Sequence, residues 1–379
     1  MKNNNKPQRK LEDPVRVIIS GGGTGGHITP ALAIADIIKE NDPRGKILFV
    51  GGPRGMEGEL VGRAGYDIRL LEVEGITRKI SASALKAVFR AGRATKHATT
   101  LLRDFSPDIV IGTGGYACYP TLRAAIKLGI PTAVHESNAA PGLAVRVLAG
   151  GLDRVWLNFD GGRTHLPMAA RVLTVGNPLP RGYSVPTPIT LPRGTRRFLL
   201  SFGGSLGASA LNQAVLSLME KERELTDVFH LHATGKREFE RMHAAFCERG
   251  LQHCTHLSLV PFITEMPRYM SAADLVICRA GAMSLSELAA LGTPAVLVPS
   301  PNVTGNHQYE NARQLADKGA AVLLEEKNIE QLSALVPALL SDREALARMA
   351  EQIRTFHRPR ANADIWQDIV ALTNKKSGR

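Results

Sequence analysis

The stretch VIISGGGTGGHITPALAIA, residues 17–35, joins a β-branched run to a glycine loop and then to a helical pattern. Strand, glycine loop and helix in this order are typical of the first unit of a doubly wound parallel sheet. A weaker copy, FLLSFGGSLGASALNQAV, follows at residues 198–215. The two stretches together predict two Rossmann-like domains in tandem.

Alternating strand and helix patterns surround both stretches. The expected strands are VRVIIS, KILFVG, PDIVIG and PTAVHE in the first half, and RRFLLSF, FHLHATG, HLSLVPF, LVICRAG and PAVLVPS in the second, with helices between them, the first from about Pro30. We therefore predict an α/β chain with a first domain over 14–177 and a second over 178–360. The proline-rich stretch after VLTVGNPLP is the expected linker, and a final helix at about 361–373 is expected to pack back on the first domain. Ligands of such sheets bind at the carboxyl ends of the strands, so we expect a cleft between the two domains.

Composition narrows the class of protein. With 379 residues, 44% hydrophobic and 22% charged, the chain resembles ordinary globular proteins. Its four cysteines lack CxxC spacing and its start, MKNNNKPQRKLEDP, lacks an apolar core, so we expect a reduced, cytoplasmic protein. The longest uncharged run, between Glu287 and Glu310, contains Pro294, Pro299 and Pro301, so we expect no membrane-spanning helix. The net charge of +12, concentrated in the first half, suits an anionic membrane surface or nucleic acid.

Glycine loops at strand ends predict anion sites. Gly21–His27 opens a helix and suits a phosphate, although no acidic residue follows at the NAD position and no GK[ST] is present. Gly112–Tyr116 is a second such loop, in which a tight turn is the alternative. Gly203–Ala208 repeats the pattern in the second half, with Ser205 as a hydroxyl donor.

Three polar segments accompany these loops. The segment from His135 to Asn138 closes a strand, where it is expected to face the same ligand edge or to cap the next helix. Glu287, expected in the first turn of a helix, suits the two hydroxyls of a ribose or simply the helix dipole. Gln308 stands at another helix start, where an amide can read sugar hydroxyls or face solvent.

A basic segment lies between Glu74 and Asp104. It contains Arg78, Lys79, Lys86, Arg90, Arg93, Lys96 and Arg103, interleaved with apolar residues such as Ile80, Val88 and Phe89. This pattern favours a peripheral contact with an anionic membrane. A solvated helix face and an RNA-binding patch are the alternatives, but no nucleic-acid module is evident, so no nucleic-acid partner is expected.

Seven motifs together resemble one family. They are GGTGGHITPALA, GTGGYACYP, HESNAAPGLAVR, VGNP, FGGSLGASALN, ICRAGAMSLSELAALGTPAVLVP and HQYENA, and in this order they are similar to the MurG family of N-acetylglucosamine transferases. The resemblance implies a GT-B fold and inverting transfer of N-acetylglucosamine from UDP-N-acetylglucosamine to the muramyl C4 hydroxyl of undecaprenyl-pyrophosphoryl-MurNAc-pentapeptide. It implies no cofactor, no protein-bound metal, a peripheral place on the cytoplasmic face of the membrane, and other cell-wall synthesis proteins as candidate partners.

The resemblance also assigns residues. It implies that Thr24, Gly25 and Gly26 belong to a loop shared by the donor and acceptor diphosphates, and that the loop of Gly114, Gly115 and Tyr116 contacts the acceptor. It implies donor contacts by Asn138, Ser205, Ile263, Gln308 and the loop Ala282, Met283, Ser284, Leu285, Ser286 and Glu287. Pro180 stands where many members have an arginine, and Arg181 is expected to replace it.

Two questions stay open at this level. The catalytic base is either His27, whose ordinary pKa suits the role, or Glu136, for its expected position. A transferase with a soluble acceptor, an epimerase, or a sugar-nucleotide sensor would share the donor motifs, but none of these needs both GTGGY and the basic segment.

Overall fold

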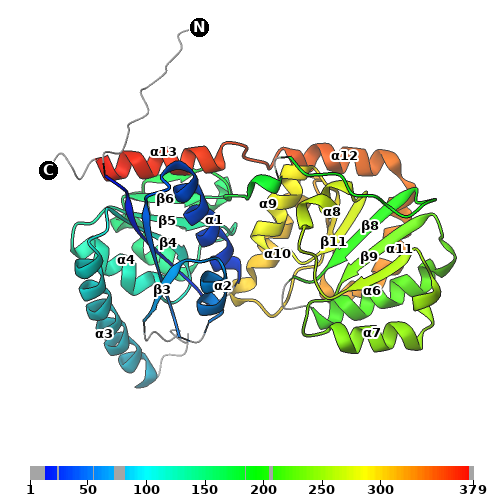
Figure 1. The fold of residues 1–379 in the computed structure, drawn as a ribbon, viewed down its shortest axis with the longest axis horizontal. Coiled ribbons are helices and arrows are strands. Elements are labelled where there is room, and N and C mark those ends of the chain that lie inside the picture. Colours follow the sequence, from blue (N-terminus) through cyan, green and yellow to red (C-terminus); the bar gives the residue numbers. More distant parts are fainter. Residues whose placement is uncertain are drawn as a thin grey trace, which may run out of the picture. The chain divides into compact units, whose positions relative to one another are not determined.

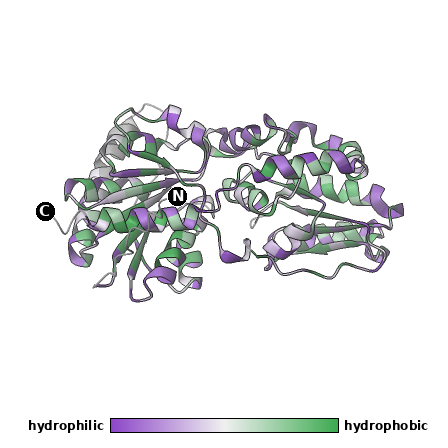
Figure 2. Ribbon diagram, turned by 90° about the horizontal axis from the view of Figure 1, so that it is seen from above, coloured by the Kyte–Doolittle hydropathy of each residue, from purple (hydrophilic) through white to green (hydrophobic). Residues whose placement is uncertain are grey.

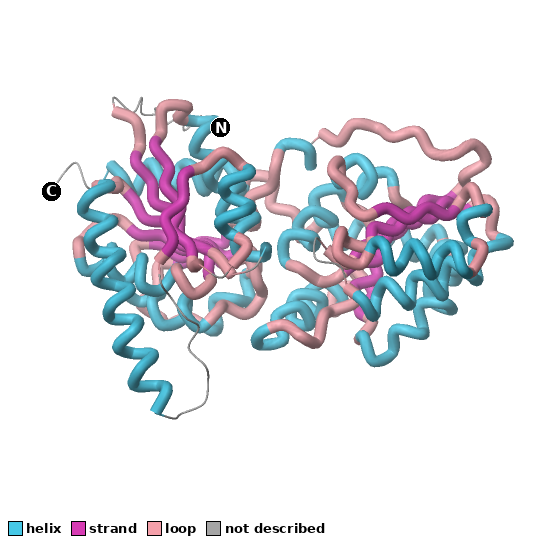
Figure 3. Tube along the Cα trace, turned by 60° about the horizontal axis from the view of Figure 1, so that its bottom comes forward, coloured by secondary structure: helices cyan, strands magenta, loops and turns pink. Residues whose placement is uncertain are grey.

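The computed structural model describes residues 13–23, 25–53, 55–71, 82–183, 185–204 and 208–374, without the side chains of 82–91 and Thr304. The chain divides into two compact units, one of Met1–Pro178 with Arg360–Arg379 and one of Leu179–Pro359. Each unit is a parallel sheet covered by helices on both faces (Figure 3).

The first unit has a seven-stranded sheet in the order β3-β2-β1-β4-β5-β6-β7. Its strands are β1 Arg16–Gly21, β2 Lys46–Gly51, β3 Asp67–Leu70, β4 Ile109–Gly114, β5 Thr132–Glu136, β6 Arg154–Leu157 and β7 Val172–Thr174. Its helices are α1 Gly25–Asn41, α2 Glu57–Arg63, α3 Ala82–Phe105, α4 Cys118–Lys127, α5 Leu143–Leu148 and α13 Ala361–Asn374. The strand order reverses beside β1, between β1 and β4, and this reversal is where such sheets bind ligands.

Two hydrophobic cores hold this sheet. One lies under α1 and α13, and the other under α3, α4 and α5, on the opposite side of the sheet (Figure 1). The central strands β1, β4 and β5 are buried almost throughout, because both faces are covered. Figure 2 shows that most of the residues in the sheet strands are hydrophobic.

The last helix, α13, packs against α1 in this unit (Figure 1). Its Asp368 accepts a hydrogen bond from Arg154 Nε at 2.7 Å and another from Trp156 Nε1 at 2.8 Å. Trp156 is fully buried and Asp368 is 9% exposed. An ion pair and an indole N–H thus attach the end of the chain to β6.

The second unit has a six-stranded sheet in the order β10-β9-β8-β11-β12-β13. Its strands are β8 Arg197–Phe202, β9 Val228–Ala233, β10 Leu257–Val260, β11 Leu275–Cys278, β12 Ala295–Leu297 and β13 Val322–Leu323. Its helices are α6 Ser209–Lys221, α7 Phe239–Glu248, α8 Met266–Ala272, α9 Ala282–Leu291, α10 His307–Ala316, α11 Leu332–Ser341 and α12 Arg343–Arg354. Short 3₁₀ turns in the two units are η1 Ala149–Gly151, η2 Asp160–His165, η3 Arg181–Tyr183, η4 Glu222–Glu224, η5 Leu251–His253, η6 Thr304–Asn306 and η7 Glu326–Gln331.

The prediction of two doubly wound parallel sheets is confirmed. The sequence patterns missed the strands β3, β6, β7 and β13, which have four residues or fewer and so show little periodicity. The first helix begins at Gly25 rather than at about Pro30, so that Pro30 lies inside α1. Among the described residues, no helix has the length and apolar character needed to cross a bilayer.

Candidate active site

The two glycine loops of the first unit pack directly against each other. Gly115 has φ +84°, and a Cβ built there would come within 2.2 Å of the Gly22 carbonyl oxygen. Gly114 has φ +101°, and its Cβ would come within 2.5 Å of His27 Nδ1. Only glycine allows both this backbone conformation and this approach. The loop ends of β1 and β4 therefore form one surface at the switch point of the sheet.

His27, in the first turn of α1, is held by Thr113 of β4. Its Nδ1 lies 2.9 Å from the Thr113 carbonyl oxygen, and Thr113 Oγ1 donates to the His27 carbonyl at 2.8 Å. Because a carbonyl only accepts, Nδ1 carries the proton in this hydrogen bond. In the neutral form of the ring the lone pair is then on Nε2, and this form of the half-buried side chain can accept a proton.

Glu136, at the end of β5, has both carboxylate oxygens engaged by its own loop. Oε1 accepts from Asn138 N at 3.0 Å and Asn138 Nδ2 at 3.1 Å, while Oε2 accepts from Gly142 N at 2.8 Å. The side chain is 4% exposed. A carboxylate so engaged orients Asn138 and the start of α5.

His135 does not face the ligand edge, so the prediction for the whole segment 135–138 is wrong at this residue. Its ring is fully buried, with Nε2 3.0 Å from the Gly176 carbonyl oxygen. Burial lowers the pKa of His135 to about 4, so the ring is neutral. Side chains alternate across a strand, which turns His135 inward when its neighbour faces the loop.

In the second unit, α9 carries the segment 282–287. Ala282, Met283 and Leu285 of this segment are buried. Glu287 is the sixth residue of α9 and not in its first turn as expected, because the helix already begins at Ala282. The helix-dipole explanation for this carboxylate is correspondingly weak.

Glu287 has a partner that the sequence patterns did not reveal. Burial raises the pKa of Glu287 to about 7, and a hydrogen bond from the Tyr183 hydroxyl opposes that rise. Tyr183 ends η3, is 8% exposed, and has its own pKa raised by burial and by Glu287. Arg181, in the same turn, is exposed. The only signal for Tyr183 in the sequence is an aromatic hydroxyl shortly after GNPLP.

Gln308, in the first turn of α10, is oriented by the loop after β12. Its Oε1 accepts from Ser300 N at 2.8 Å, which leaves the amide nitrogen as the group that can donate elsewhere. Arg279 binds the same loop through the Val298 carbonyl at 3.1 Å and forms an ion pair with Glu326. Arg279 thus connects the loops after β11 and β12.

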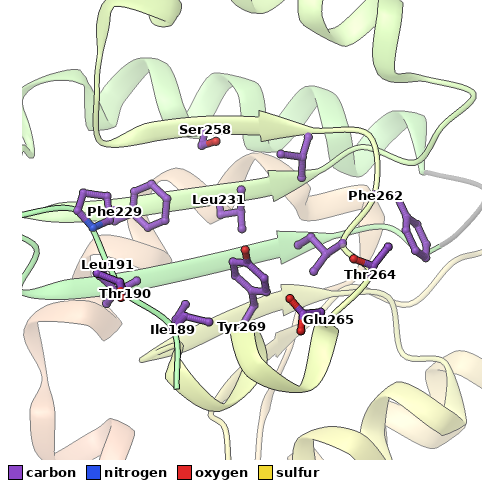
Figure 4. Close-up of a pocket in the computed structure, with 13 residues that line it drawn as sticks. Ile189, Thr190, Leu191, Phe229, Leu231, Ser258, Phe262, Thr264, Glu265 and Tyr269 are labelled. Carbon is purple, nitrogen blue, oxygen red and sulfur yellow. The ribbon is translucent and has the colours of Figure 1, made fainter. Parts of the chain in front are cut away.

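Ile263 is one of the residues that line a cavity of about 530 Å³ in the second unit (Figure 4). The cavity lies between residues 189–192, the β9–β10 face of the sheet and Tyr269 of α8. Ile263 as a whole is 6% exposed, so it is buried in the wall of this cavity.

Comparison with known proteins identifies the family. The glycosyltransferase family 28 N-terminal domain matches residues 17–157, and the glycosyltransferase family 28 C-terminal domain matches residues 198–365. The UDP-N-acetylglucosamine–N-acetylmuramyl-(pentapeptide) pyrophosphoryl-undecaprenol N-acetylglucosamine transferase of Acetivibrio thermocellus is 37% identical, over 96% of this chain and 100% of that relative. The transferase of the same name from Desulforudis audaxviator is 40% identical, over 95% and 99%. The chain belongs to this transferase family.

A solved structure agrees with the family assignment. The crystal structure of Acinetobacter baumannii MurG is 31% identical, with a TM-score of 0.74 over 94% of this chain and 100% of that one. The resemblance inferred from seven motifs is therefore confirmed, and with it the glycosyltransferase class and the GT-B type of each domain.

Some predicted site residues lie outside the described part of the chain. These are Thr24, Ser205 and residues 76–81 of the basic segment. Gly25 and Gly26 begin α1, and Tyr116, at the end of the second glycine loop, is 60% exposed. Among the described residues, no group of three or more His, Cys, Asp or Glu side chains is placed to hold a metal ion.

Proposed function

We propose that the chain transfers N-acetylglucosamine from UDP-N-acetylglucosamine to the muramyl C4 hydroxyl of undecaprenyl-pyrophosphoryl-MurNAc-pentapeptide. The product is the disaccharide lipid precursor of peptidoglycan, so the enzyme would serve cell-wall growth, cell shape and division. The proposal rests on near full-length similarity to transferases of this name and on one geometric observation. That observation is the joined pair of glycine loops, with His27 oriented by Thr113 beside them.

His27 is the proposed general base. The C4 hydroxyl gives its proton to Nε2 while its oxygen forms a bond to the anomeric carbon of the donor. The bond from that carbon to the UDP oxygen breaks on the opposite face, so the α-linked sugar becomes β-linked and UDP leaves. We assign to Glu136 the role of orienting Asn138, because both of its carboxylate oxygens already accept hydrogen bonds from the loop 138–142.

The donor is assigned to the second unit. Glu287 would accept from the ribose hydroxyls, Gln308 would donate to the sugar hydroxyls, and the Ile263 backbone would read the uracil edge. Ser205 and the N-terminus of α9 would stabilise the negative charge that develops on the diphosphate. Thr24, Gly25 and Gly26 would contact diphosphate oxygens, and Arg181 would take the place of the arginine common in the family.

The enzyme is proposed to act at the cytoplasmic face of the membrane, held there by the basic segment between Glu74 and Asp104. In the described part of that segment, Arg93 and Lys96 are exposed on α3. Each cationic side chain near an anionic surface contributes about 1 kcal/mol of attraction.

The test is transfer of radiolabelled N-acetylglucosamine from the UDP donor to a short-chain muramyl-pentapeptide diphosphate lipid. We expect a single β-linked disaccharide product and stoichiometric UDP. Conversion of UDP-N-acetylglucosamine to another UDP-sugar without an acceptor, or no transfer by folded protein, would overturn the proposal.

A further inference from the structure

The buried carboxylate of Glu57 forms a hydrogen bond to the first glycine loop. Glu57 is the first residue of α2, yet its side chain is only 2% exposed. Oε2 accepts from Gly23 N at 3.0 Å, and Oε1 accepts from Gly52 N at 2.7 Å. One side chain therefore connects the loop after β1 to the loop after β2.

Three glycines make room for this carboxylate. A Cβ built at Gly22 would lie 2.2 Å from Glu57 Oε1, one at Gly51 2.4 Å from its Cγ, and one at Gly55 1.8 Å from its Oε2. No methyl group fits at any of these positions while Glu57 keeps its place. The backbone of both loops thus encloses this one side chain.

Burying the Glu57 carboxylate costs free energy, and this cost calls for an explanation. A carboxylate buried without hydrogen bonds is strongly disfavoured, and here two backbone N–H groups stabilise it. Its negative charge also lies beneath a loop proposed to receive a diphosphate, which by itself would weaken anion binding. If this position only filled space, an apolar side chain would cost less free energy there than a buried carboxylate. A role for Glu57 must therefore account for its two hydrogen bonds to the loops.

We propose that Glu57 is a positioning residue for the acceptor diphosphate. By holding Gly23 N–H inward, it sets the path of the loop so that the N–H groups at the start of α1 face outward toward phosphate oxygens. The loop stays in this shape before substrate arrives, so less ordering is needed on binding. This inference rests on the proposed function of the same loop.

The experiment measures acceptor and donor kinetics of Glu57→Gln with the full chain. The amide nitrogen of glutamine cannot accept, so at least one of the two N–H groups loses its partner. We expect the acceptor KM to rise about 10- to 150-fold, as for loss of a hydrogen bond to a charged group, with kcat changed less than about threefold. The UDP dissociation constant should rise less than the acceptor KM, since most donor contacts are assigned to the second unit.

Glu59→Gln is the matched control. Glu59 lies on the same helix and pairs with Arg63 at 2.6 Å, but its side chain is 61% exposed. Loss of an exposed ion pair has little effect, so all kinetic constants should match wild type. If Glu57→Gln does not fold, Glu57→Asp serves instead, because it keeps the charge but is too short to reach both N–H groups. The acceptor KM is again expected to rise more than the UDP dissociation constant.

A double variant separates positioning from space filling. Gly22→Ala alone should impair the acceptor KM, because its methyl group meets Glu57. If Glu57 only fills space, combining Gly22→Ala with Glu57→Ala should restore the acceptor KM, and the proposal is then overturned. Equal acceptor KM in Glu57→Gln and wild type would also overturn it. Inactive wild-type protein would instead refute the proposed function, so the two failures are distinguishable.

Discussion

His27 and Thr113 are joined by two hydrogen bonds that run in opposite directions, Nδ1 to the Thr113 carbonyl and Thr113 Oγ1 to the His27 carbonyl. The first sets the tautomer of the ring, and the second ties the backbone of α1 to the end of β4. A side chain on the first glycine loop is thus oriented by the second.

The first prediction concerns the base. His27→Ala should lower kcat about 10²- to 10⁴-fold, the usual contribution of general base catalysis, and leave UDP affinity unchanged in calorimetry. Thr113→Val keeps the carbonyl that orients the ring but removes Oγ1, so its kcat should fall far less. Nearly normal turnover in His27→Ala would exclude this residue as the base.

Glu136→Gln tests the other candidate for the catalytic base. The glutamine nitrogen would face one of the N–H donors of the loop, so Asn138 should lose its orientation. We expect the donor KM to rise more than kcat falls, which steady-state kinetics can measure. A larger kcat loss than in His27→Ala, with an altered pH profile, would reassign the base to Glu136.

The second prediction concerns Glu287. Glu287→Ala should weaken UDP binding about 10- to 150-fold, because hydrogen bonds to a charged group are lost. Calorimetry with UDP measures this directly. Unchanged affinity would remove Glu287 from the donor site.

The third prediction concerns pH. The pKa of Glu287 is raised to about 7, and only the ionised carboxylate accepts from both ribose hydroxyls, so UDP affinity should fall as the pH drops below about 7. Tyr183→Phe removes the hydrogen bond that opposes the rise, so the pH midpoint of UDP binding should move upward. A midpoint unmoved by Tyr183→Phe would contradict the interaction.

The same shift has a consequence for stability. The folded protein keeps the Glu287 proton up to about pH 7, whereas an unfolded glutamate releases it near its ordinary pKa of 4.5. Its contribution to stability is therefore present below pH 4.5 and is lost as the pH rises toward 7. Glu287→Gln should gain stability relative to wild type between pH 5 and pH 8, measured by denaturant unfolding.

The fourth prediction concerns α13. Asp368→Asn breaks the ion pair with Arg154 and leaves that guanidinium partly buried, so the unfolding free energy should fall by about 3 kcal/mol. Asp364→Asn is the control, since Asp364 pairs with Arg360 in a far more exposed position of the same helix. Equal melting temperatures of the two variants would contradict the role of Asp368.

The fifth prediction concerns the membrane. Reversing Lys79, Lys86 and Arg90 to Glu should abolish sedimentation with anionic vesicles and slow transfer to a bilayer-embedded acceptor, but spare a short-chain, water-soluble acceptor. The control reverses three exposed basic residues of the second unit, Lys318, Arg343 and Arg348, with the same change in net charge. Equal loss with both acceptors would place the segment in the catalytic machinery. If the charge-reversed variant still binds vesicles, the basic segment is a solvated helix face and not the membrane contact.

The sequence by itself determined the two-sheet fold and the family. Parallel strands covered on both faces appear as unbroken apolar runs, and glycine loops at their ends are local patterns, so residues 17–35 and 198–215 sufficed. It also indicated His27, Glu287 and Gln308 as candidates, because each lies beside such a loop.

Only the tertiary structure decided how these candidates are held. Thr113 orients His27 across 86 positions of sequence, and Asp368 reaches Trp156 across 212. Glu57 and Tyr183 appear in the sequence as an ordinary helix start and an aromatic residue in a linker. Their roles depend on burial and on hydrogen bonds between distant segments, which no local periodicity encodes. The inward turn of His135 and the occupied oxygens of Glu136 likewise follow from packing, and the proposal of His27 rather than Glu136 as the base draws on these contacts.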